Sequence, residues 1–67
     1  MIKCFEWRTL ERLESLINRA GRYMVNVRDY CMQQGIFHLE NGVKVITLED
    51  LQEIAYLFDV PGSVYAL

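Results

Sequence analysis

The side chains with the most reactive chemistry in this 67-residue chain are two cysteines and a single histidine. Cys4 and Cys31 do not form a CxxC pair, and His38 has no second histidine, so we predict two reduced core thiols and a structural or surface histidine. A catalytic nucleophile would need one cysteine beside His38, on elements with no reason to converge. Glu11 and Glu14 share one helix side, a pattern common on solvated faces. We therefore expect no enzyme, metal or cofactor.

The charges are distributed unevenly along a chain whose net charge is −2. Residues 1–35 carry an excess of two positive charges, whereas residues 36–67 carry an excess of four negative charges. Such a dipolar protein can be steered toward a charged partner, but it lacks the strong positive charge of a dedicated nucleic-acid binder. No apolar run is long enough to span a membrane, and the first residues do not resemble a signal peptide. We expect one small cytoplasmic domain over residues 1–67.

The strongest regularity is an apolar heptad pattern between residues 9 and 34. The apolar positions are separated by alternating steps of three and four residues, which is the spacing of a helical seam. They are Leu10, Leu13, Ile17, Ala20, Met24, Val27 and Cys31. A continuous helix over this range would be about 39 Å long, more than so small a fold covers easily. The pattern therefore predicts a homodimer through the seam residues Leu13, Ile17, Ala20, Met24 and Val27.

Gly21, in the middle of the seam, leaves two interpretations open. A glycine inside a helix costs about 1 kcal/mol relative to alanine, yet the heptad phase continues unbroken across it. We therefore favour one long helix. If Gly21 instead ends a first helix in the left-handed conformation, the chain holds two shorter helices in an arrangement like a helix-turn-helix.

Away from the seam, the helical wheel gathers basic side chains into one ridge that lies beside two tyrosines. One interpretation is a solvated face on which arginine stems cover apolar edges. The other is a contact surface, because arginine and tyrosine are enriched among binding hot spots. The predicted partner-binding residues are Arg12, Arg19, Arg22, Tyr23 and Tyr30.

The clearest local signal is Asn41-Gly42 between two runs rich in β-forming residues. This dipeptide is preferred in type I′ turns and pairs Glu40 with Val43 across a hairpin. Thr47 follows as the predicted N-cap of a second helix that ends near residue 58. The first two turns of this helix are crowded with acidic residues, namely Glu49, Asp50 and Glu53. They form either a solvated face that stabilises the helix start or an acidic patch for a basic partner.

These elements predict an α+β fold with two helices packed on a small antiparallel sheet built around the Asn-Gly hairpin. The predicted order is β-α-β-β-α-β, with a first strand at residues 2–7, a long first helix and a last strand at residues 63–67. The favoured function is a non-enzymatic protein-interaction module, such as a small accessory or inhibitor protein of a mobile element.

Several segments carry a resemblance that gives the alternative function. Val27-Arg28, Gly35-Ile36-Phe37, Asn41-Gly42-Val43-Lys44-Val45 and Leu48-Glu49-Asp50-Leu51 resemble the recognition helix, wing and following helix of MerR- and excisionase-type winged-helix regulators. The resemblance implies a DNA-binding transcriptional regulator in which Asn26 and Arg28 contact bases and Lys44 contacts phosphate. The chain departs from this pattern after Gly21, where Arg22-Tyr23-Met24 lacks a Ser or Thr cap for a recognition helix.

Overall fold

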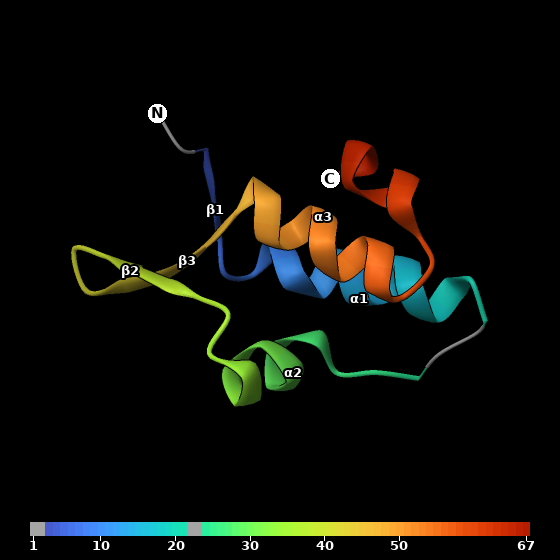
Figure 1. Ribbon diagram of the computed structural model, residues 1–67, viewed down its shortest axis with the longest axis horizontal. Coiled ribbons are helices and arrows are strands. Elements are labelled where there is room, and N and C mark those ends of the chain that lie inside the picture. Colours follow the sequence, from blue (N-terminus) through green and yellow to red (C-terminus); the bar gives the residue numbers. More distant parts are fainter. Residues whose placement is uncertain (1–2, 22–23) are drawn as a thin grey trace.

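The computed structural model describes residues 3–21 and 24–67 (Figure 1). Its elements follow the order β1 (Cys4–Glu6), α1 (Thr9–Arg19), α2 (Val27–Gln34), β2 (His38–Glu40), β3 (Val43–Thr47), α3 (Leu48–Leu57) and the 3-10 helix η1 (Pro61–Ala66). Three α-helices and a three-stranded antiparallel sheet are thus present in the described part, which confirms the α+β class.

One hydrophobic core joins the helices to the sheet. α3 packs on α1, and η1 contacts both of these helices, while the β2–β3 hairpin extends beyond one end of the helical layer (Figure 1). The core is formed by side chains from five elements: Leu10, Leu13, Ile17, Val27, Cys31, Ile46, Leu51, Ile54, Ala55 and Val64. Each element contributes too little apolar surface to be stable alone, so shared burial holds the small fold together.

The prediction of one long first helix is wrong. α1 ends at Arg19, and Gly21 has a φ of 79°, in the left-handed region that glycine occupies at no steric cost. The chain then turns back, and α2 begins at Val27 and packs against α1. The break has a physical reason, because folding back lets both parts of the apolar seam face the same core instead of overhanging it.

The sheet has the strand order β1-β3-β2, with both neighbouring pairs antiparallel. Asn41 and Gly42 connect β2 to β3 with φ values of 54° and 79°, and Glu40 lies opposite Val43. Such positive φ values at both central residues are the geometry that favours Asn-Gly.

The predicted order with a strand at each end needs two corrections. The helix count rises because α1 and α2 are separate, and residues 63–67 form no strand in the described structure. Pro61 instead begins η1, because its fixed φ suits the first turn of a helix. Val64 of η1 is buried in the core, so the C-terminal segment packs on α3 and not on the sheet.

The helix caps agree with the predictions only in part. Thr47 caps α3 as predicted, because its hydroxyl oxygen accepts a hydrogen bond of 3.1 Å from the backbone N–H of Asp50. At α1, the capping position is held by Arg8 without a side-chain cap bond, and Thr9 is the first residue of the helix. At α2, Asn26 supplies the cap that the sequence analysis did not identify.

Candidate protein-binding surface

The cysteines and the histidine lie in separate environments. Cys31 is fully buried, and this burial, with the nearby Asp50 charge as a smaller cause, raises its thiol pKa from 9.0 to about 11. Cys4 is a free thiol exposed on β1, so the prediction of a core thiol is wrong at this position. His38 is exposed, and its Nε2 lies 3.4 Å from Asp50 Oδ2. Among residues 3–21 and 24–67, no group of three His, Cys, Asp or Glu side chains could hold a metal ion. A thiol with so high a pKa is a poor nucleophile at neutral pH.

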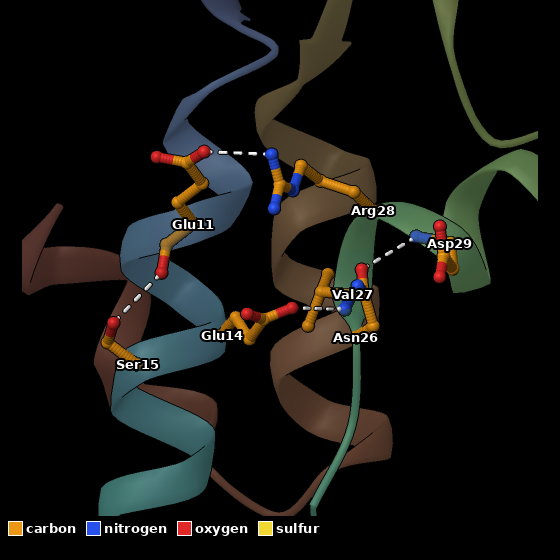
Figure 2. A network of polar contacts seen from close by, with 7 residues as sticks. All are labelled: Glu11, Glu14, Ser15, Asn26, Val27, Arg28 and Asp29. Carbon is orange, nitrogen blue, oxygen red and sulfur yellow. Dashed lines mark hydrogen bonds and ion pairs between the residues drawn. The ribbon is translucent and has the colours of Figure 1, made fainter.

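Polar side chains of α1 close the start of α2 (Figure 2). Glu14 accepts a hydrogen bond of 2.8 Å from the backbone N–H of Val27, the first residue of α2. Asn26 accepts a second bond, of 3.0 Å, from the N–H of Asp29. The N-terminus of a helix attracts anions through such free N–H groups. Here, two of these groups are already bonded within the chain, so the start of α2 is a weak site for a phosphate.

The three residues that the winged-helix resemblance assigned to DNA are also engaged inside the chain. Asn26 is the α2 cap, and Arg28 forms an ion pair of 2.8 Å with Glu11 (Figure 2). The Lys44 ammonium lies 5.6 Å from the ring centroids of both Trp7 and Phe37. Contacts of these side chains with DNA would therefore compete with contacts inside the chain.

The predicted partner-binding residues that the structure describes are divided between two helices, α1 and α2. Arg12 and Arg19 are exposed on α1, and Arg12 borders an open pocket near the start of that helix. Tyr30 is half-buried on α2, edge-on to Phe58 with ring centroids 5.6 Å apart. Arg22 and Tyr23 lie outside the described residues. The predicted ridge required one continuous helix, and the turn at Gly21 removes the helical phase that linked Arg12 to Tyr30.

The predicted dimer seam is likewise divided. Leu13, Ile17 and Val27 are fully buried in the core of this chain, so they cannot also cover a second copy. Ala20 is exposed, and Met24 is 92% exposed. The apolar seam is therefore mainly a core pattern, and it no longer supports a dimer through a continuous first helix.

The outward face of α3 carries the feature that the sequence analysis did not select. Tyr56 is 78% exposed and Leu57 is 54% exposed, although both are large hydrophobic side chains. They line an open groove of about 500 Å³ together with Glu49, Gln52 and Glu53. Exposed apolar side chains bordered by polar ones are typical of interaction sites.

A crevice between α2 and α3 continues this surface. It has a volume of about 220 Å³, and α2 with the residues after it contributes Tyr30 and Ile36 to its wall. Glu53 and Leu57 border both hollows, so the two are adjacent. We call the combined surface the α3 groove and define it by these residues: Tyr30, Ile36, Glu49, Gln52, Glu53, Ile54, Tyr56 and Leu57.

The α3 groove is negatively charged and unneutralised. α3 contains no basic residue, and Glu49 and Glu53 are exposed without an ion pair to any described basic side chain. Lys44, the one basic residue after position 35, is held beside Trp7 and Phe37. The acidic patch considered from the sequence thus includes Glu49 and Glu53, whereas Asp50 is turned toward His38. The sequence signal for this surface was the pair Tyr56-Leu57 beside the buried stripe of α3.

Within the described residues, no helix is both long and apolar enough to cross a membrane. Comparison with known protein families, curated proteins and solved structures shows no significant match.

Proposed function

We propose that this protein is a non-enzymatic binding module that holds a protein partner on the α3 groove. The observation that carries the proposal is the exposure of Tyr56 and Leu57 beside two glutamates that have no ion pair among the described side chains. Tyrosine is enriched at the centres of protein interfaces, where its ring adds apolar area and its hydroxyl keeps a polar partner. The small size suits an accessory or inhibitor protein of a mobile element.

The proposal also rests on what the other polar groups do. At the start of α2, Glu11 pairs with Arg28 and Glu14 accepts a hydrogen bond from the backbone N–H of Val27, so these charged groups contribute to folding. Glu49 and Glu53 of α3 have no ion pair within the part of the chain that the structure describes. Covering the exposed leucine and tyrosine with another molecule would lower the free energy of the system. A bound protein would satisfy both kinds of group at once.

The test is affinity capture from an extract of the source organism, followed by mass spectrometry. Leu57→Glu places a charge in the α3 groove, whereas Leu39→Glu makes the same change at a 64% exposed leucine on the hairpin. We expect Leu57→Glu to capture at least about tenfold less partner than wild type, and Leu39→Glu to capture as much as wild type. Circular dichroism checks that both variants fold. Retention by Leu57→Glu together with loss by Leu39→Glu would place the partner on the hairpin and refute the proposal.

A winged-helix DNA-binding regulator is the second candidate, favoured by one observation. α2, the β2–β3 hairpin and α3 follow one another in the order recognition helix, wing and following helix that the resemblance implies, and β1 pairs with the hairpin. Fluorescence anisotropy with a labelled DNA duplex at rising salt distinguishes the candidates. Binding that weakens steeply with salt would favour DNA, because phosphate contacts release counterions. We expect no such binding at micromolar protein.

A further inference from the structure

Resting on the proposed function, we infer that the segment held by the α3 groove is a basic amphipathic helix that lies antiparallel to α3. Its apolar residues cover Tyr56 and Leu57, and basic residues toward its C-terminus pair with Glu53 and Glu49. The inference has three parts, which concern charge, shape and direction.

The charge follows from the two glutamates. Both are exposed, neither is paired with a described basic side chain, and both border the same groove as Leu57. A partner with acidic residues here would face like charges, and this repulsion would lower its affinity. A wholly apolar partner would leave both carboxylates to be desolvated without a counter-charge. Lysine or arginine is therefore the complementary choice opposite Glu49 and Glu53.

The shape follows from the spacing of the groove residues on α3. Glu49, Glu53 and Leu57 form one row of residues four apart, and Gln52 and Tyr56 form a second row. Rows of this kind are the ridges into which another helix packs, at an interaxial distance of about 8–10 Å. Successive members of a row are about 6 Å apart along the axis. A second helix has the same repeat, so its residues one turn apart can meet successive members of a row.

The direction follows from the order of charge along α3. The glutamates lie in its first two turns, whereas Tyr56 and Leu57 lie at its end. In an antiparallel helix, the basic residues that meet the glutamates fall near the helix C-terminus, where positive side chains are favoured by the helix dipole. The partner sequence should therefore place its apolar pair first and its basic pair about one turn later.

A second copy of this chain does not match the same pattern. Arg12 and Arg19 are exposed on α1 but are seven residues apart, whereas Glu49 and Glu53 are four apart. Arg8 and Arg12 have the matching spacing of four, but Arg8 is already paired with Glu6 at 2.6 Å. The residues before Arg8 form β1, so the described part of the chain has no helical turn there to carry the apolar pair that must precede the basic pair. Self-association is accordingly an outcome that would contradict the inference.

The test uses labelled synthetic helical peptides and fluorescence anisotropy. The probe carries two leucines one turn apart, followed about one turn later by two arginines one turn apart. A first control peptide has glutamates in place of the arginines, and a second has the order of the two pairs reversed. We expect the arginine probe to bind wild type at least about tenfold more tightly than either control peptide. A tenfold difference in Kd corresponds to about 1.4 kcal/mol of binding free energy.

Reversing the charge of the groove in the protein tests the inference most directly. The variant Glu49→Arg, Glu53→Arg should lose at least about tenfold of its affinity for the arginine probe and gain affinity for the glutamate peptide. Glu40→Arg, on the exposed hairpin, is the matched control and should behave as wild type. The single variant Glu53→Arg retains the acidic first turn of α3 and should show the same direction of change. Circular dichroism verifies folding of each variant.

The results separate the inference from the proposed function. Equal affinity for arginine and glutamate peptides, or no exchange of preference in the double variant, overturns the basic-helix inference. If Leu57→Glu still abolishes capture of the partner in that case, the proposed protein-binding function stands, and the bound segment is not a basic helix. Light scattering that shows self-association abolished by Glu53→Arg would assign the groove to a second copy and overturn the inference as well.

Discussion

The junction of α1 with α2 and the outer face of α3 use similar residues in opposite ways. At the junction, Glu11 pairs with Arg28 and Glu14 bonds the first N–H of α2 (Figure 2). On α3, Glu49 and Glu53 are exposed and unpaired among the described side chains, next to Leu57. The same residue type therefore serves folding in one region and is available to a partner in the other. A glutamate or a leucine of this chain can be assigned to a binding surface only when its contacts inside the chain are known.

The largest contrast is expected between two leucines. Leu13 of α1 is fully buried and Leu57 of α3 is 54% exposed. Leu13→Ala should lower the free energy of unfolding by about 2–5 kcal/mol through lost burial and the cavity that remains, whereas Leu57→Ala should cost less than about 1 kcal/mol. Urea denaturation of both variants measures the difference. Equal losses would mean that Leu57 belongs to the core and that the α3 groove is not an open surface.

The next effect concerns the two cysteines and pH. The thiol of Cys31 has its pKa raised to about 11, so the folded protein retains a proton that the unfolded chain releases near pH 9. Stability should be fully present below pH 9 and fall between pH 9 and 11, by about 2–3 kcal/mol for two pKa units. Thermal denaturation across this range should show the fall in wild type and in Cys4→Ser, but not in Cys31→Ala. If the melting temperature of all three proteins changed with pH in the same way, the fall in stability could not be assigned to the Cys31 thiol.

A smaller effect compares two glutamates directly. Glu14→Ala removes the acceptor for the Val27 N–H and should lower the free energy of unfolding by about 1–3 kcal/mol, because a partly buried donor loses its charged partner. Glu53→Ala should change it by less than about 0.5 kcal/mol, because the carboxylate is exposed and unpaired among the described residues. Chemical denaturation of both variants checks this. A larger loss in Glu53→Ala would indicate a structural role for the groove carboxylate.

The smallest effect separates two arginines. Arg28→Ala breaks an ion pair whose side chains are 42% and 56% exposed, so we expect a loss of about 0.2–1 kcal/mol at low salt. Arg12→Ala, at an exposed position of α1, should lower the free energy of unfolding by less. The difference in free energy of unfolding between the two variants should become smaller in high salt, because exposed charges are screened. A difference that is unchanged by salt would show that Arg28 acts through packing of its stem.

Local sequence signals determined the features that need only neighbouring residues. Asn41-Gly42 specifies a tight turn because both residues tolerate positive φ, and in the structure both have it. Thr47 followed by Asp50 three residues later specifies the start of α3 through one side-chain hydrogen bond. Asn26 followed by Asp29 is an equivalent signal for the start of α2, because the amide oxygen of asparagine caps a helix as the hydroxyl of serine or threonine does.

Only the tertiary structure decided where the apolar pattern is interrupted and which of its residues are covered. The heptad phase is the same whether the helix continues or turns at Gly21, so periodicity cannot distinguish Leu13 in the core from Met24 at 92% exposure. The same holds for charge, because Glu14 and Glu53 differ only in what lies across from them. Short-range geometry was therefore enough to specify the Asn41-Gly42 turn and the α3 cap, and the pattern of strand and helix signals was enough for the α+β class. The turn-back of α2 onto α1 decided which side chains remain available to a partner, because burial depends on contacts between residues distant in the chain.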